Sequence, residues 1–85
     1  MFYVYVIKSL QKDFIYTGYT DNLKRRFREH NLKENISTKL YAPFKLIYYE
    51  AYRNKLDAFN RERMLKHKGA SIGHLKRRIK RSLSE

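Results

Sequence analysis

The chain of 85 residues contains no cysteine, no tryptophan, one proline and only three glycines. The absence of cysteine excludes a disulfide framework and a zinc site built from thiolates, and it is typical of a reducing compartment such as the cytoplasm. No apolar run approaches the ~20 residues that a membrane span needs, and Phe2–Ile7 is among the longest. The first residues also lack a basic segment followed by an apolar one, so we expect neither a secretory signal nor a membrane partner.

Acidic residues are scarce as well. The chain has 8 Asp and Glu against 20 Lys and Arg, and its formal net charge is +12. Residues 61–85 alone hold nine Lys or Arg and two acids, a net charge of +7. Such a density of positive charge repels itself in the folded chain and attracts polyanions. We therefore expect a nucleic acid as the partner, rather than an anionic membrane surface or a generic solubilising charge.

Aromatic residues are plentiful, with eight Tyr and five Phe. A chain of this length buries only about 60–65% of its unfolded surface, so rings that each bury about 150–250 Å² matter for its stability. We expect one small domain over residues 1–85, because the sequence shows no internal repeat or linker.

Alternation and turn residues predict an α+β fold in the order ββαβαα, with a small three-stranded antiparallel sheet flanked by helices. The strands are expected at Phe2–Lys8, Phe14–Tyr19 and Phe44–Tyr52. The first strand is apolar on both faces, which is typical of a central strand covered on both sides. The first two strands form a hairpin, and a symmetric register would place Tyr5 roughly opposite Tyr16.

The helices are expected from their capping residues and apolar stripes. The first covers about Asn22–Leu32, with Thr20 or Asp21 as its cap. The second begins after Asn54 and ends at Gly69. Ser71 is expected to cap the last helix, whose apolar stripe comprises Ile72, Leu75, Ile79 and Leu83 and whose other sides are basic.

Three charged or polar residues lie on helix faces that should be apolar. Arg26 and His30 share a face with Leu23 and Phe27, and Glu62 lies between Ala58 and Leu65. A carboxylate that faces a core is costly unless it is paired or bound to a metal. In the structural interpretation, Glu62 pairs with a nearby Arg, Arg26 lies over an aromatic ring, and His30 interacts with the dipole at the helix C-terminus.

Taken together, these residues and the hairpin tyrosines Tyr5 and Tyr16 supply the groups that phosphodiester cleavage needs. An Arg and a metal ion stabilise the negative charge of the pentavalent phosphorane. A single Glu suits one Mg²⁺, which keeps several waters, and argues against a two-metal site. A Tyr or a His could accept a proton from the attacking water, although a Tyr with a pKa near 10 would need a neighbouring cation to lower it.

The order of these residues resembles that of the GIY-YIG endonucleases, specifically the short stand-alone type related to the nuclease module of excinuclease C. The two motifs appear as Tyr3-Val4-Tyr5 and Tyr16-Thr17-Gly18. Arg26 follows eight residues after Gly18, then comes His30, and Glu62 lies in the run NRERMLK. The segment TKLYAPFKLIYYE also resembles the short members, so that the resemblance covers roughly residues 2–68.

The resemblance implies roles for the matching positions. Tyr5 would be the general base or would position the attacking water, and Tyr16 would hydrogen-bond to that water or to phosphate. Gly18 would permit a close approach. Arg26 would stabilise the phosphorane, His30 would assist proton transfer or hold phosphate, and Glu62 would bind Mg²⁺ or Mn²⁺.

The implied activity is that of a metal-dependent DNA endonuclease, acting on branched or damaged DNA in repair or recombination. The alternative is a catalytically weak or inactive protein of the same fold that binds DNA, RNA or ribosomes. The alternative accounts for the charge, but it gives Glu62 no function beyond a structural one.

The sequence also departs from the family pattern. Tyr3 and Thr17 replace a Gly and an Ile, and there is no Asn beyond Asn60, where many relatives use one after the metal-binding helix. We expect no appended DNA-binding domain, so that targeting would come from the basic surface, a protein partner or the shape of the substrate. The residues expected to contact phosphate are Lys39, Lys76, Arg77, Arg78, Lys80 and Arg81.

Overall fold

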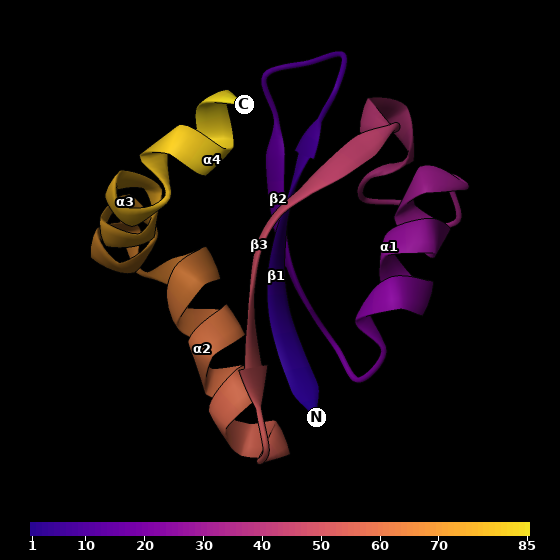
Figure 1. Ribbon diagram of the computed structural model, residues 1–85. Coiled ribbons are helices and arrows are strands. Elements are labelled where there is room, and N and C mark those ends of the chain that lie inside the picture. Colours follow the sequence, from indigo (N-terminus) through magenta and orange to yellow (C-terminus); the bar gives the residue numbers. More distant parts are fainter.

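The computed structural model describes all residues from 1 to 85. In chain order the elements are β1 (Phe2–Ser9), β2 (Ile15–Thr20), α1 (Leu23–Asn31), the 3-10 helix η1 (Lys39–Tyr41), β3 (Phe44–Tyr52), α2 (Lys55–His67), α3 (Gly69–Arg78) and α4 (Lys80–Ser84). The three strands form one antiparallel sheet in the order β2-β1-β3 (Figure 1). The predicted α+β class and the central position of the first strand are confirmed.

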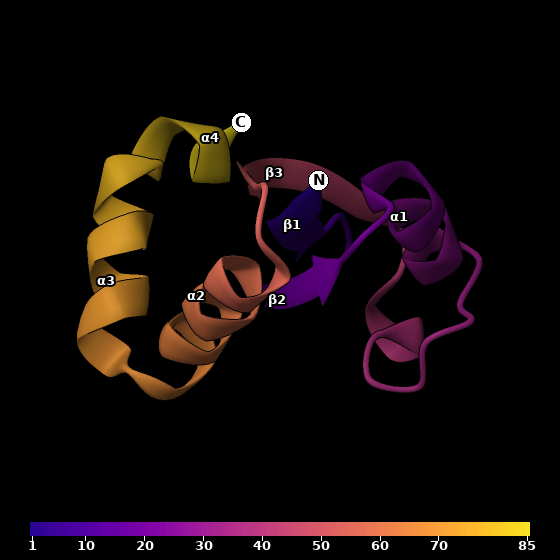
Figure 2. The same ribbon diagram turned by 90° about the horizontal axis from the view of Figure 1, so that it is seen from below.

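The sheet is the middle of three layers (Figure 2). Helix α1 covers one face, and helices α2 and α3 cover the other. Strand β1 alternates between the two layers: Val4 and Val6 pack with Ala58 and Leu65 of α2. On the α1 side a second cluster comprises Tyr5, Ile7, Ala42 and Phe44. Both faces of β1 are therefore buried, which explains why its sequence is apolar throughout.

The register of the hairpin differs from the prediction by two residues. Tyr5 pairs with Gly18, and Tyr16 pairs with Ile7. The difference arises from the connection between the strands, in which the Ser9 hydroxyl accepts hydrogen bonds from the backbone N–H groups of Gln11 and Lys12. Tyr16 consequently lies diagonally from Tyr5 on the same face, and a glycine lies directly opposite Tyr5.

The cap of α1 is also different from the two predicted residues. The side chain of Asn22 accepts a hydrogen bond from the backbone N–H of Arg25 at 3.1 Å, as an N-cap does. Thr20 instead supports Asn22, because its hydroxyl accepts the backbone N–H of Asn22 at 3.1 Å. Asn54 caps α2 as predicted, through a 2.8 Å hydrogen bond from the N–H of Leu56.

The prediction of one last helix capped by Ser71 was wrong. Helix α3 already begins at Gly69 without a side-chain cap, and the helical path is interrupted at Ile79, whose φ and ψ are −106° and 27°. The interruption bends the apolar stripe so that Leu75, Ile79 and Leu83 all pack on the same core. Tertiary packing therefore overrides the straight helical repeat.

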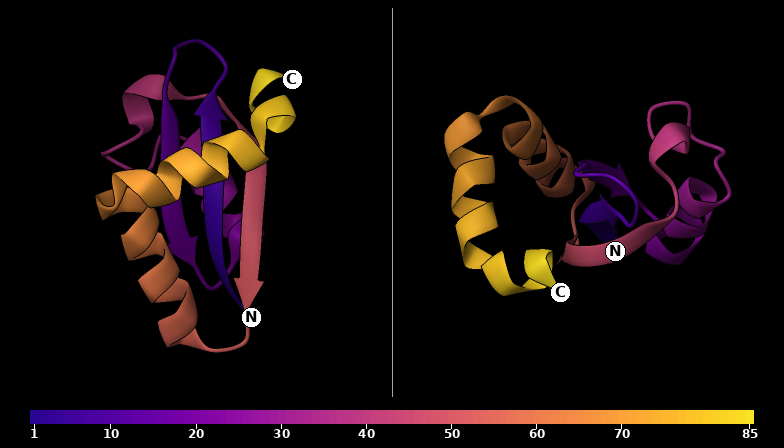
Figure 3. Two further views of the ribbon diagram at one scale, coloured as in Figure 1. Left: turned by 90° about the vertical axis from the view of Figure 1, so that its left-hand side faces the viewer. Right: turned by 90° about the horizontal axis from the view of Figure 1, so that it is seen from above.

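Helix α3 crosses the sheet from the β2 side to the β3 edge, where α4 follows it (Figure 3). Contacts of α4 are with α3 and β3, and the Lys8 ammonium donates a 2.8 Å hydrogen bond to the carbonyl of Leu83. None of the helices has the length and apolar character that crossing a membrane requires.

Candidate active site

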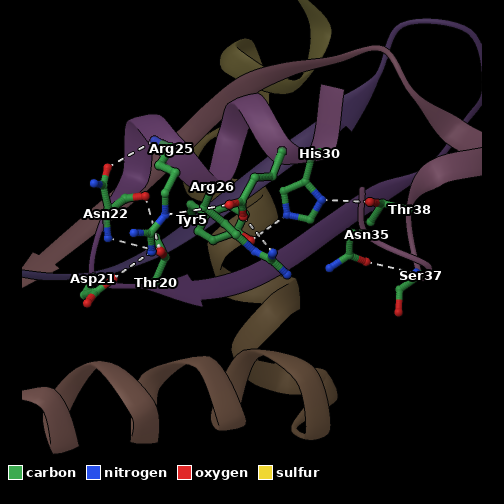
Figure 4. Close-up of polar contacts among 11 residues, drawn as sticks. Tyr5, Thr20, Asp21, Asn22, Arg25, Arg26, His30, Asn35, Ser37 and Thr38 are labelled. Carbon is green, nitrogen blue, oxygen red and sulfur yellow. Dashed lines mark hydrogen bonds and ion pairs between the residues drawn. The ribbon is translucent and has the colours of Figure 1, made fainter. Parts of the chain in front are cut away.

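A buried pair of side chains lies between α1 and the sheet. The Tyr5 hydroxyl and the Nε2 of His30 share a hydrogen bond of 2.7 Å, and the Nδ1 of His30 is 2.7 Å from the Thr38 hydroxyl (Figure 4). Tyr5 is 1% exposed, and His30 and Thr38 are fully buried. Both ring nitrogens of His30 therefore have partners, and neither contacts solvent.

The glycine of the second motif makes room for this pair. A Cβ added to Gly18 would overlap the hydroxyl and the ring carbons of Tyr5. The φ angle of Gly18 is not positive, so the requirement is space rather than backbone freedom. The group that lies closest to Gly18 is the Tyr5 side chain, not backbone, so a residue with a Cβ at position 18 would displace the Tyr5 ring.

The surroundings set the protonation states of the pair. Burial and the positive charge of Arg26 lower the pKa of His30 to about 4, so the imidazole is neutral at pH 7. Burial raises the pKa of Tyr5 to about 12, although hydrogen bonding and charge from Arg26 act in the opposite direction. The negative charge of Glu62 adds to this increase. Both members of the pair are thus uncharged.

Arg26 lies above the pair and is held by a neighbouring acid. Its Nη1 is 3.0 Å from a carboxylate oxygen of Glu29, and the two side chains are 31% and 28% exposed. Arg26 also lines a surface cleft of about 390 Å³ that Arg25 and Lys55 border. The guanidinium is therefore at the boundary between the buried pair and solvent.

Tyr16 and Glu62 complete the cluster from β2 and α2. The ring of Tyr16 is centred 6.5 Å from that of Tyr5 and 5.2 Å from that of His30. The Lys66 ammonium lies 4.9 Å from the centre of the Tyr16 ring and 3.1 Å from the Glu62 carboxylate. Lys66 thus connects the carboxylate of α2 to the tyrosine of β2.

The structure therefore brings together all five residues that the sequence suggested for catalysis, at the β2 edge of the sheet between α1 and α2. This arrangement combines one partly exposed guanidinium, one carboxylate, and a neutral tyrosine–histidine pair. It can bind an anion through Arg26 and transfer a proton between a tyrosine oxygen and an imidazole nitrogen.

The donors available for a metal ion are few. Nowhere in the chain do three His, Asp or Glu side chains converge as a set of metal ligands. Glu62 is the carboxylate of this cluster that projects from α2, and its side chain is 17% exposed, so water can reach it. One carboxylate together with waters is a donor set that Mg²⁺ accepts, because this ion keeps much of its hydration shell. The residues present fit one such ion and no more.

Some expectations for these residues need correction. His30 does not hold phosphate at a surface, because it is fully buried. The ion-pair partner of Glu62 is Lys66 rather than an Arg. Glu62 also lies at the border of the apolar strip of α2, since Leu56 and Phe59 are exposed where only Ala58 and Leu65 are buried.

The expected phosphate-binding residues are placed elsewhere. Lys39 lies exposed in η1, and the basic residues Lys76, Arg77, Arg78, Lys80 and Arg81 lie exposed on α3 and α4. Lys39 follows Thr38, the partner of His30, in the chain, but none of these six residues lines the cleft that Arg25, Arg26 and Lys55 border.

Sequence reasoning missed three partners in the site: Thr38, Lys66 and Glu29. Lys66 and Glu29 were detectable in principle, because they lie four and three residues from Glu62 and Arg26 on the same helices. Thr38 lies outside the regular elements, and no local signal connects it with His30.

Comparisons with known proteins point to one family. The sequence model of the GIY-YIG catalytic domain matches residues 1–80. The chain is 39% identical over 67 residues to a UPF0213 protein of Clostridium perfringens, a match that covers 78% of this chain and 71% of the relative.

It is also 38% identical over 69 residues to a UPF0213 protein of Limosilactobacillus reuteri, with 78% and 71% covered. It is 35% identical over 65 residues to one of Haloquadratum walsbyi, with 75% and 72% covered. No solved structure gives a significant match. The chain therefore belongs to the GIY-YIG family.

Proposed function

We propose that this protein is a metal-dependent DNA endonuclease that hydrolyses phosphodiester bonds at the β2 edge, with branched or damaged DNA as its substrate in repair or recombination. The family is one of nucleases, whose members generally use divalent metal ions. The observation that carries the proposal is the hydrogen-bonded Tyr5–His30 pair, which lies beneath Arg26 and beside Tyr16 and Glu62.

Glu62 is the residue that would hold the metal ion, Mg²⁺ or Mn²⁺. A divalent ion there would supply positive charge against the phosphate oxygens. The ion pair between Glu62 and Lys66 must open for this to happen, and Lys66 is 34% exposed, so its ammonium can move into solvent.

Arg26 provides the second positive charge. Its guanidinium is paired with Glu29 in the free protein, and a phosphate offers it two oxygens in the same planar geometry. Exchange of Glu29 for phosphate would draw Arg26 outward and uncover the Tyr5 hydroxyl. The same guanidinium would then stabilise the extra negative charge of the phosphorane.

Proton transfer falls to the buried pair. The neutral His30 would donate its Nδ1–H to Thr38, which leaves Nε2 free to accept the Tyr5 proton. Tyr5 could then accept a proton from the attacking water as its own proton passes to His30. Because the pKa of His30 is about 4, this imidazole would carry the proton only briefly. Tyr16 would hydrogen-bond to the water or the phosphate at the surface.

The experiment is cleavage of a labelled set of plain, nicked, flapped and branched DNA, and of RNA, in the presence of Mg²⁺, Mn²⁺ or EDTA. Cuts that require the metal ion support the proposal, and the preferred structure identifies the substrate class. Failure to cut any of the nucleic acids with either metal ion would contradict it.

A second candidate function is nucleic-acid binding without turnover. It is favoured by one observation, namely that Arg26 and Glu62 are both neutralised by partners within their own helices. Tight, salt-sensitive binding without cleavage would support this function.

A further inference from the structure

A cluster of cations surrounds a hollow of about 240 Å³ where α3 meets α4. The residues that line the hollow are Arg77, Arg78, Ile79, Lys80, Arg81 and Ser82. No acid lines it, and none of its four cations takes part in any of the ion pairs of the chain. We call the exposed residues Arg77, Lys80 and Arg81 the junction surface.

The cations of the junction surface lack acidic partners, whereas two cations at the β2 edge have them. Arg25 and Arg26 are neutralised by Asp21 and Glu29, whereas Arg77 has only the imidazole of His74 beside it, at 2.7 Å. Cations without acidic partners repel one another across the hollow, and phosphate groups would relieve that repulsion with release of counterions. The junction surface is therefore an anion attractor separate from the β2 edge.

The two places lie at opposite edges of the sheet. Tyr16 and Gly18 belong to β2, and the order of strands places β1 between β2 and β3. The junction lies at the β3 edge (Figure 3): α4 contacts β3, and the charge of Arg78 acts on the pKa of Tyr48, a β3 residue. The chain measures 31 × 26 × 20 Å. A straight duplex placed against the β2 edge would leave the β3 edge facing away from it.

We propose that the junction surface binds a second nucleic-acid segment, distinct from the one placed at the β2 edge, so that one chain holds two segments at once. The proposal rests on the proposed function for the identity of the partner, nucleic acid. It specifies the substrate class further as two duplex arms or two duplexes, one anchored and one presented for cleavage. Guanidinium groups suit the anchoring role, because each can bind a phosphate through two parallel hydrogen bonds.

The test measures bridging between two duplexes. A biotinylated duplex on beads is loaded with the protein at limiting amounts, unbound protein is washed away, and a fluorescent second duplex is added in EDTA, so that no strand is cut. We expect the wild-type protein to retain the second duplex. The triple variant Arg77→Gln/Lys80→Gln/Arg81→Gln should retain at least about tenfold less of the second duplex than the wild type does. Binding of the first duplex should weaken by only a few-fold.

A matched variant controls for the loss of charge. Lys33→Gln/Arg53→Gln/Lys68→Gln also removes three exposed cations, none of which lines the hollow, and it should bridge as the wild type does. Arg78 stays unchanged in both variants, because its charge acts within the folded β3 region. Thermal unfolding of both variants establishes that they are folded.

Three results would overturn the proposal. In the first, the wild type does not retain the second duplex. In the second, the triple variant bridges two duplexes as well as the wild type does. In the third, the triple variant loses first-duplex binding and bridging to the same extent. Equal bridging would point to two copies of the chain, and parallel loss to one continuous surface. Because the measurement needs no cleavage, the proposal can fail while the nuclease function stands, or hold while that function fails.

Discussion

At the scale of single residues, His30 makes the folded protein sensitive to acid. The pKa of its imidazole is about 4 in the folded chain, against an ordinary value of 6.5. The unfolded chain therefore binds more protons between these values, and the free energy of unfolding falls as pH falls through this window. Protonation of His30 should remove up to about 3 kcal/mol of stability.

The measurement is urea unfolding of the wild type and His30→Gln at several pH values between 7 and 4. Glutamine does not titrate, yet it can hydrogen-bond. We expect the variant to be less stable at pH 7 and to lose clearly less stability on acidification. Parallel curves for the two proteins would show that His30 is not held neutral.

The Lys66 ammonium is paired with the Glu62 carboxylate, which a metal ion would need as its ligand. This ammonium is 3.1 Å from Glu62, and it repels a second cation at the same oxygen atoms. We expect Lys66→Met to tighten binding of Mn²⁺ by about tenfold, as measured by isothermal titration, because one competing charge at about 4 Å is removed. Lys68→Met removes an exposed charge outside the cluster and should change little. Unchanged or weaker binding by Lys66→Met would contradict the role of Glu62 as the ligand.

At the scale of elements, β3 and α2 are joined through the carboxylate of Glu50, which accepts hydrogen bonds from three side chains. Arg61 donates to both oxygens of Glu50 at 3.0 and 3.1 Å. The hydroxyls of Tyr48 and Tyr52 donate to the same carboxylate. Burial raises the pKa of Glu50, but these hydrogen bonds outweigh it and hold the pKa below its ordinary value.

We expect Glu50→Gln to lower the free energy of unfolding by about 2 kcal/mol, because it leaves the Arg61 charge half-buried without its partner. Chemical denaturation measures this loss. Glu34→Gln, at an exposed position without an ion pair, should remain within about 0.5 kcal/mol of the wild type. Equal stability of both variants would mean that the network adds nothing to the packing of α2 on β3.

The elements show which features a sequence can predict. The three strands and the face of α1 follow from local periodicity, so that Arg26 and His30 were recognisable as residues out of place. The same periodicity suggested a broader apolar face for α2 than the structure has, because Leu56 and Phe59 are exposed. Family motifs added Tyr5, Tyr16 and Gly18. The burial of Tyr5 and His30 was not predictable, because it depends on how α1 and the segment with Thr38 close over the sheet.

Other features depend on interactions between distant parts of the chain. The hairpin register follows from hydrogen bonds to Ser9 that no repeat pattern indicates. The interruption at Ile79 reflects the shape of the core that Leu75 and Leu83 share. To predict that the basic residues of α3 and α4 lie at the β3 edge, one likewise has to know the path of α3 across the sheet.

At the scale of the whole molecule, the cations of the junction surface, which have no acidic partners, and the Tyr5–His30 cluster lie at different edges of the sheet. The net charge of +12 attracts a polyanion from any direction. Under our two proposals, the junction surface would hold one nucleic-acid segment while the β2 edge holds the segment to be cut. Glu62 tests this division most simply, because it is an acid within a strongly basic protein and a pure binding surface has no use for it.

The central measurement is the rate of cleavage of the preferred DNA with Mg²⁺ by the wild type, Glu62→Gln and Glu34→Gln. The two variants remove the same charge, one from the cluster and one from an exposed side chain that forms no ion pair. The account predicts a loss of about 100-fold or more for Glu62→Gln, with DNA binding and folding retained, and wild-type cleavage for Glu34→Gln. Metal-dependent cleavage that Glu62→Gln retains would contradict the account.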